Sequence, residues 1–487
     1  MSIAKMLLYS IAISGLSACA TLPQPVKPPE FQSVNGLDQT LDATPPSTAI
    51  MTKWPQANWW QALHNTQLQD LIETGLRDSP NLQAATARVA QAEAAADFQA
   101  AELLPTLSAN IELHNRRYSG TDFYGPNGGK TFHGAYIDPA VFKYHLDLWG
   151  KDRAALEAAL GKERAQGAEL AMTRLMLSTA ITREYIRLCA VTEDMELSRS
   201  LRETAARQVQ LDQLRWQEGL SSREHLYPSE QVLAAAQQRE TDAAHHSQIL
   251  RNRLAALAGR QPDWGAQIQI APLTILTYLP PPQSLSLGLL AHRPDVAASL
   301  WRAKAAAQMI KIAETNFYPD VNLVGFAGLR SLNFKDLFLS NGTSLAYGIG
   351  PTLSLPLFEG GRLEAELSNQ QAGYRTAVAS YNQTLLEAVQ QVADSLAGWR
   401  QTAADINAQT QAVAAAQAAA GLAASRYRAG LSNLDAELEA TAALLRQQLT
   451  ASALLSAHQQ ASIALIAALG GGYQAENITM SEPDNHE

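Results

Sequence analysis

Two stretches of the chain alternate strictly between two kinds of side chain. From Thr106 to Leu113 the odd-numbered residues are apolar and the even-numbered residues are polar. From Leu345 to Leu357 most odd-numbered residues are large and apolar, whereas the even-numbered residues are small. A period of two predicts β-strands, and this pairing of faces is typical of a barrel wall between lipid and water. Pro351 removes a ladder donor from the second strand, and a sandwich inside a soluble domain is the alternative interpretation.

Long stretches without proline predict two very long helices. Lys151–Glu218 and Arg362–Ala429 are compatible with helix throughout. At 1.5 Å per residue, each helix would be on the order of 100 Å long. One core cannot cover that length, so each helix is expected to lie along others as in a coiled coil. Gly219 and Gly430 stand where helix-terminating glycines are expected.

Landmarks recur in the same order in the two halves of the chain. Pro80 and Pro294 are 214 positions apart, and so are Pro105 and Pro319. The motif LDLWGKDR is matched by LPLFEGGR, RWQEGLSS by RYRAGLSN, and ALAGR by AALGGGY. The order predicts an internal duplication, in which each repeat is helix, strand, strand, very long helix and helix.

The expected strands are too few to close a membrane barrel within one chain. They lie at about residues 105–117, 134–149, 319–332 and 345–358. Membrane barrels need about eight strands or more, and an open sheet edge in lipid is prohibitive. Closure therefore requires oligomerisation: two chains supply eight strands and three supply twelve. Eight strands leave an interior filled by side chains, whereas twelve leave room for a lumen, so a trimer is favoured.

The N-terminus predicts a lipoprotein. Residues 1–18 have the basic start, apolar segment and small-residue end of a signal peptide. Leu16-Ser17-Ala18-Cys19 resembles the bacterial lipobox, in which the cysteine is acylated. We therefore expect diacylglycerol and palmitate on Cys19. An ordinary signal peptide with an incidental cysteine is the alternative. By lipobox convention, Ala20 favours the outer membrane.

Charge and cysteine content exclude some classes of protein. Charged residues make up 17% of the chain and its formal net charge is −9, which becomes −10 once the signal peptide with Lys5 is removed. Without a cluster of lysine and arginine, nucleic-acid binding is not expected. With Cys19 acylated, Cys189 is the remaining free thiol, so no intramolecular disulfide is expected.

The sequence favours no catalytic or metal-binding site. Adjacent helical residues point about 100° apart, so His245 and His246 are poorly placed to share a metal. HNRRY (residues 114–118) lies at the expected outer end of a strand, and an extracellular loop explains it. GPNGGK (residues 125–130) lacks the phosphate-loop spacing and is interpreted as a loop. Cys189 is interpreted as a helix-packing thiol. Neither an enzymatic activity nor a cofactor is predicted, apart from the lipid on Cys19.

GLLAHRPDV (residues 288–296) places a histidine, an arginine and an aspartate around Pro294. The matching segment TGLRDSPNL (residues 74–82) lacks the histidine. Pro294 suits a helix start and Asp295 suits the positive end of the helix dipole. The triplet is therefore interpreted as a helix start and not as a catalytic site.

An ordered set of motifs resembles the outer-membrane efflux lipoproteins of the TolC, OprM and NodT type. The set comprises the lipobox, WPQANWWQAL, RPDV, FYPDV, LPLFEGGR, YRAGL and LGGGY. The resemblance implies a mainly α fold with a membrane β-barrel. The implied assembly is a homotrimer with a long periplasmic α-helical barrel and a twelve-stranded β-barrel, four strands per protomer. It also implies a periplasmic adaptor and an inner-membrane transporter, of the resistance-nodulation-division or the major-facilitator type, as partners.

The resemblance also directs attention to the segment after the second long helix. Members of this family close the periplasmic aperture there with acidic rings and with contacts between Tyr, Arg and Asp. Tyr427, Asp435 and Glu439 are the aperture candidates in this sequence. A threefold ring of Glu439 would bias the pore towards cations. Alternatively, Glu439 lies on a solvated helix face.

The expected organisation follows from these landmarks. Residues 1–18 form the signal peptide, 19–62 an acylated extended segment, 63–262 the first repeat, 263–288 a linker in the equatorial region, 289–472 the second repeat and 473–487 a polar tail. The predicted function is an exit duct of a tripartite efflux system for drugs or other small toxic compounds. It would lie in the outer membrane of a Gram-negative bacterium, anchored by lipid and extending into the periplasm. A non-conducting periplasmic coiled-coil scaffold is the alternative, and an envelope hydrolase would need a site that the sequence does not offer.

Overall fold

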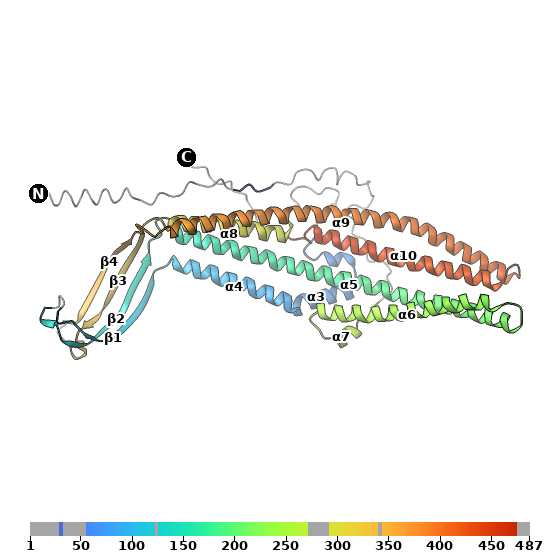
Figure 1. The fold of residues 1–487 in the computed structure, drawn as a ribbon, viewed down its shortest axis with the longest axis horizontal. Coiled ribbons are helices and arrows are strands. Elements are labelled where there is room, and N and C mark those ends of the chain that lie inside the picture. The colour runs from blue at the N-terminus through green and yellow to red at the C-terminus, as the bar shows by residue number, and fades with distance from the viewer. Residues whose placement is uncertain (1–28, 33–54, 122–124, 271–291, 339–342, 475–487) are drawn as a thin grey trace. The chain divides into compact units, whose positions relative to one another are not determined.

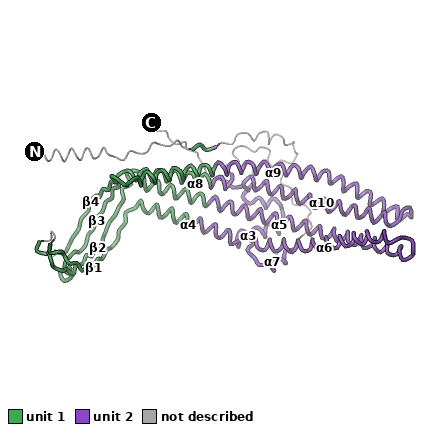
Figure 2. The backbone as a smooth tube through the Cα atoms, in the orientation of Figure 1, with its two compact units in different colours: residues 1–31, 89–166, 299–381 green, residues 32–88, 167–298, 382–487 purple. Residues whose placement is uncertain are grey.

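The structure is a computed structural model that describes residues 29–32, 55–121, 125–270, 292–338 and 343–474. The chain divides into two compact units (Figure 2). The strand unit consists of residues 1–31, 89–166 and 299–381, and the helix unit of residues 32–88, 167–298 and 382–487, as far as these are described. Each unit is considered by itself below.

The strand unit contains a four-stranded antiparallel sheet in the order β1-β2-β3-β4 (Figure 1). The strands are β1 (Thr106–Arg117), β2 (Thr131–His145), β3 (Asp320–Ser331) and β4 (Leu345–Ser354). The short 3-10 helices η2 (Gly125–Asn127) and η4 (Phe334–Asp336) lie in the connections β1–β2 and β3–β4. Four strands are thus confirmed.

The expected ends of two strands are wrong. β2 begins at Thr131 and ends at His145, because the next residues turn to start a helix: the Asp147 carboxylate accepts the backbone N–H groups of Asp152 and Arg153. β4 ends at Ser354, two residues before Pro356, which has no N–H to donate. Pro351 stays inside β4, paired with Leu323, and an edge strand tolerates this residue.

The two outer strands of the sheet expose large apolar side chains. Within the described residues β1 pairs with β2 alone and β4 pairs with β3 alone, so each has an open edge. The exposed apolar side chains are Leu107, Ile111 and Leu113 of β1 and Leu345, Tyr347, Ile349 and Leu353 of β4. The alternation read from the sequence therefore produces apolar surface that the folded chain does not cover.

The long helices form where the proline-free stretches predict them. The helices α5 (Lys151–Gln217) and α9 (Arg362–Arg428) have 67 residues each, one residue fewer at the C-terminal end than expected. The helices that follow, α6 (Arg223–Leu257) and α10 (Leu434–Ala468), have 35 residues each. Before the strands lie α4 (Pro80–Glu102) and α8 (Pro294–Thr315). The element order recurs, while the duplication itself stays a prediction.

The core of the helix unit lies where α5, α6 and α10 meet two short N-terminal elements. These are the 3-10 helix η1 (Trp59–Leu63) and α3 (Thr66–Asp78), which Asn65 caps by accepting the backbone N–H of Leu68. The buried cluster is formed by Trp59, Trp60, Leu63, Leu68, Leu71, Ile72, Leu177, Ile181, Tyr185, Ile186, Leu188, Cys189, Leu250, Leu254, Ile268, Ile463 and Ile466. The segment up to residue 62 is therefore not extended throughout. α7 (Pro262–Ala266) likewise lies at the start of the expected linker.

Several predictions fall outside the described residues. They concern the signal peptide, Cys19, most of the linker and the tail after residue 474. In the described part of the chain, no helix is both long and apolar enough to cross a membrane.

Candidate functional site

Two helical hairpins of the helix unit end in the same kind of turn. In the first, α5 stops at a positive-φ glycine, Gly219, and Leu220 donates its backbone N–H to the carbonyl of Arg215. In the second, α9 stops at Gly430 (φ 69°), and Leu431 donates to Arg426. This is the hydrogen-bond pattern of a glycine-terminated helix, so the predicted role of both glycines is confirmed. Asn433 then caps α10.

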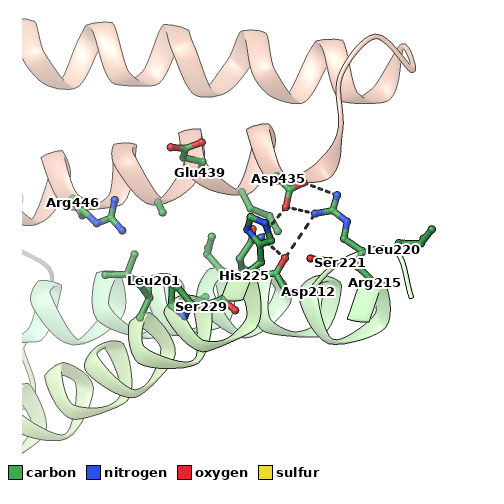
Figure 3. A pocket seen from close by; sticks show the side chains of 17 residues that line it. Leu201, Asp212, Arg215, Leu220, Ser221, His225, Ser229, Asp435, Glu439 and Arg446 are labelled. Carbon is green, nitrogen blue, oxygen red and sulfur yellow. Dashed lines mark hydrogen bonds and ion pairs between the residues drawn. The ribbon is translucent and has the colours of Figure 1, made fainter. Parts of the chain in front are cut away.

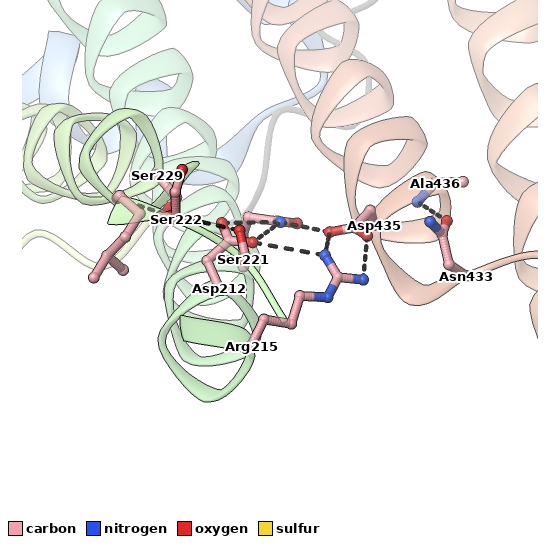
Figure 4. A network of polar contacts seen from close by, with 10 residues as sticks. Asp212, Arg215, Ser221, Ser222, Ser229, Asn433, Asp435 and Ala436 are labelled. Atoms are coloured by element: carbon pink, nitrogen blue, oxygen red, sulfur yellow. Dashed lines mark hydrogen bonds and ion pairs between the residues drawn. The ribbon is translucent and has the colours of Figure 1, made fainter. Parts of the chain in front are cut away.

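A charged link joins the two hairpins close to these turns (Figures 3 and 4). The Arg215 guanidinium of α5 holds the Asp435 carboxylate of α10 with two nitrogens, at 2.9 and 2.6 Å. The Gln208 side-chain amide also donates to Asp435, at 2.8 Å, and to Asp212, at 3.3 Å. Two nearly parallel hydrogen bonds from one guanidinium fix the geometry as well as the charge.

The link shifts the acidity of both partners. Hydrogen bonding from Arg215 holds the pKa of the Asp435 carboxyl below its usual range, against the opposing effect of partial burial. The same hydrogen bond raises the pKa of Arg215. Both groups are therefore charged at neutral pH. Because both side chains are about 30% exposed, solvent weakens their attraction.

A groove of about 610 Å³ adjoins the link (Figure 3). Asp435 and Glu439 line it from α10, one helical turn apart, and Glu439 is exposed. Arg446 lines the far end on the same helix. The remaining lining residues are Leu201, Thr204, Ala205, Gln208, Asp212, Arg215, Leu220, Ser221, His225, Pro228, Ser229, Val232, Leu438 and Ala442.

The structure brings two of the three aperture candidates together. Asp435 and Glu439 share the groove, whereas Tyr427 does not line it. Tyr427 lies in the last turn of α9 and is 40% exposed. Their role at an aperture stays a prediction.

Sequence reasoning missed Arg215 and Gln208, the donors to Asp435. They lie 220 and 227 residues away from it along the chain. Arg215 precedes the EGLSS turn as Arg426 precedes AGLSN, so a comparison of the two turns would have directed attention to it. Its pairing with Asp435 depends on which face of α5 meets α10, and local sequence does not specify this.

The histidine pair, Cys189 and the HNRRY segment lie in the following surroundings. The ring centroids of His245 and His246 are 6.3 Å apart, and among the described residues no cluster of three or more potential metal ligands occurs. Burial raises the pKa of the Cys189 thiol to about 12. HNRRY lies at the end of β1, as expected: residues His114 to Arg117 pair with Gly134 to Thr131 of β2.

Comparison with known proteins identifies the family. The family model described as outer membrane efflux protein matches residues 71–260 and 286–471. The chain belongs to this family. The multidrug resistance outer membrane protein MdtQ of Escherichia coli O6:H1 is 31% identical to it over 467 residues, which cover 92% of this chain and 95% of MdtQ. These matches establish an outer-membrane protein of an efflux family, whose members are channels and not enzymes.

Solved structures agree in fold. The outer membrane protein VceC of Vibrio cholerae is 36% identical to this chain. The two superpose with a TM-score of 0.78 over 86% of this chain and 100% of VceC. The outer membrane channel CmeC of Campylobacter jejuni has a TM-score of 0.82 at 19% identity and covers 93% of this chain and 95% of its own. The second likeness concerns the fold alone.

Proposed function

We propose that the protein is the outer-membrane exit duct of a tripartite efflux system and conducts drugs or other small toxic compounds to the cell exterior. It acts as a homotrimer, in which three four-stranded sheets close into one twelve-stranded barrel. The name of its relative MdtQ, a multidrug resistance outer membrane protein, supports the substrate class. The proposal includes diacylglycerol and palmitate on Cys19.

The observation that carries the proposal is the apolar, open-edged sheet. Large apolar side chains such as Ile111 on β1 and Ile349 on β4 are exposed, and both strands have one unpaired edge. A solvated sheet would cover such side chains and protect such edges. Lipid accepts the apolar face, and pairing of β1 with β4 of another copy removes the edges. A non-conducting coiled-coil scaffold does not require an exposed apolar sheet with open edges.

The hairpin ends are proposed as the periplasmic aperture. There the duct would meet a periplasmic adaptor and an inner-membrane transporter, of the resistance-nodulation-division or the major-facilitator type. The Arg215–Asp435 link holds α10 against α5 and so favours a closed aperture. Three copies of Glu439 would place acids around the pore and bias it towards cations.

Conductance across a planar lipid bilayer tests both parts of this proposal. We expect the purified full-length protein to run as a heat-sensitive trimer and to open cation-selective channels. Arg215→Ala should raise the open probability, because it removes the bidentate link between α5 and α10. Arg446→Ala is the matched control, since Arg446 lines the same groove and no ion pair of its side chain occurs among the described residues.

The duct proposal fails if the protein is a monodisperse monomer that never conducts. The aperture proposal fails separately if channels form but Arg215→Ala and Arg446→Ala behave alike. Glu439→Gln should lower cation selectivity without changing the trimer, and unchanged selectivity would place Glu439 on a solvated face.

A further inference from the structure

The strand unit contains a groove of about 650 Å³ where the strands join the helices. It is lined by three segments: the end of β2 and the residues that lead into α5, the link from α8 to β3, and the link from β4 to α9. The lining side chains divide into an apolar rim and a set of charges of both signs. The rim exposes large apolar side chains, and some of the charges lack partners among the described residues, which together favour a bound ligand over water.

The apolar rim consists of large side chains that stay exposed. Trp149 and Tyr318 stack with ring centroids 5.0 Å apart, and the indole N–H donates to the Pro319 carbonyl at 2.8 Å. The indole is thus fixed in orientation, although it is nearly half exposed. Leu357 is 75% and Phe358 is 90% exposed. Tryptophan and tyrosine rings with one polar contact are typical of the level of lipid headgroups.

Within the described residues, the charges in the groove include an unpaired cation, Lys151, and a carboxylate with one unbonded oxygen, Asp320, besides Asp147, which pairs with Arg153. The Lys151 ammonium lines the groove and makes no hydrogen bond or ion pair with any other described residue. The Asp320 carboxylate is 45% exposed, and its Oδ1 accepts from the Asn322 amide and lies 3.8 Å from His145 Nε2. Its Oδ2 is left open within the described chain. Glu359 and Arg362 pair with each other at 2.9 Å and add no net charge.

We propose that this groove binds the headgroup of a zwitterionic aminophospholipid. Lys151 takes the phosphate, Asp320 accepts from the primary ammonium, and the acyl chains lie along Trp149, Leu357 and Phe358. The proposal rests on the proposed insertion of the strands in a membrane, since it places the groove at the inner surface of the bilayer. An anionic lipid would bring no cation to Asp320, and a trimethylated ammonium would bring no hydrogen-bond donor.

Lipid retention by the intact protein tests the proposal. The full-length protein is inserted in nanodiscs of equal parts phosphatidylethanolamine, phosphatidylcholine and phosphatidylglycerol, released into detergent, and its bound lipid is measured by native mass spectrometry. We expect phosphatidylethanolamine to be retained about threefold or more over phosphatidylcholine, as the net loss of one solvent-exposed hydrogen bond predicts. Equal retention of the three lipids by the wild-type protein would overturn the proposal without any variant.

Two variants of conserved size separate the charges. Asp320→Asn should abolish the preference for phosphatidylethanolamine over phosphatidylcholine, and Lys151→Gln should lower retention of all three lipids by a similar factor. Asp97→Asn on α4 and Lys162→Gln on α5 are matched controls at exposed positions. If the controls change retention as much as the groove variants do, the groove is not the site.

Lipid retention and channel conductance are measured separately, so the lipid proposal and the duct proposal can fail independently. A protein that retains phosphatidylethanolamine but forms no channel would overturn the duct and leave the lipid site standing. A conducting trimer with equal retention of all three lipids would do the reverse.

Discussion

The C-terminal end of α6 meets the start of α4, and the C-terminal end of α10 meets the start of α8, through closely similar backbone contacts. We call these the first and the second joint. In the first joint, a Cβ on Gly259 would collide with the backbone carbonyl of Asp78. In the second, a Cβ on Gly470 would collide with the carbonyl of His292. Each carbonyl lies two residues before the proline that opens a helix, so the two joints have the same backbone arrangement.

The side chains of the two joints differ. In the first joint the residue before the proline is a small buried serine, Ser79. The half-buried Asp78 there pairs with two exposed arginines, Arg77 and Arg260. In the second joint the residue before the proline is Arg293, which is 2% exposed.

Arg293 connects three parts of the second joint. It binds Asp295 with two nitrogens, at 3.1 and 2.6 Å, donates to the Ala468 carbonyl at the end of α10, at 2.8 Å, and donates to Gln391 of α9, at 2.9 Å. The same backbone joint can therefore be stabilised by a surface ion pair or by a buried arginine. Only the second arrangement makes one side chain indispensable, because removing a buried charge leaves its partners without donors.

Arg293→Ala is expected to have the largest effect of the variants that separate the joints. It leaves the Ala468 carbonyl and the Gln391 side-chain oxygen without this donor and Asp295 without its cation, a loss of about 3–5 kcal/mol. The thermal unfolding midpoint of the purified protein measures it. Ser79→Ala, at the matching position of the first joint, is the control and should stay close to wild type. Equal midpoints for the two variants would remove the distinction between the joints.

Local rules predicted the helix starts in these joints, but not the side-chain energetics. Pro80 and Pro294 open α4 and α8 as expected, and at the hairpin turns, outside the joints, Gly219 and Gly430 end α5 and α9. These signals depend on φ and on a missing N–H alone. The burial of Arg293 depends on α9 and α10, which lie about 100 residues or more further along the chain. The link of Arg215 to Asp435 has the same origin. Sequence periodicity gives the apolar face of a helix, and not which charged side chain on the polar face meets another helix.

Substitution of the joint glycines should give the next largest effect, and it should be similar in both joints. Gly259→Ala and Gly470→Ala each force alanine into a positive φ and against a backbone carbonyl, at a combined cost of about 2–3 kcal/mol. Gly219→Ala provides the control, since its φ is also positive but nothing lies within 4 Å of the added Cβ. Its smaller loss measures the backbone strain alone. A loss at Gly259 equal to that at Gly219 would mean that the first joint yields to the added methyl group.

The Arg215–Asp435 link combines the bidentate geometry of Arg293–Asp295 with the exposure of the first joint. The pKa of Asp435 is lowered in the folded protein, chiefly by the hydrogen bond from Arg215. The ionised Asp435 therefore contributes its full stabilisation above the ordinary aspartate pKa. This stabilisation disappears as the pH falls through the lowered pKa of the folded state, below about pH 4. After discounting for solvent screening, we expect no more than about 1 kcal/mol. Unfolding midpoints of wild type and Asp435→Asn should differ at pH 7 and converge below pH 4, and a constant difference would contradict this.

The exposed ion pairs of the first joint should give the smallest effect. The pKa of Asp78 is lowered, first by its hydrogen bond with Arg77 and also by the charge of Arg260, so the carboxylate is ionised at neutral pH and both arginines share it. Removal of one arginine leaves Asp78 with the other and with water, which is why Arg260→Ala should scarcely move the unfolding midpoint. The small difference from wild type should vanish at high salt, where exposed charges are screened, whereas the loss in Arg293→Ala should persist. A large, salt-resistant loss of stability in Arg260→Ala would show that the first joint also depends on its side chains. The joints would then differ in the burial of their arginines but not in how much those arginines stabilise the fold.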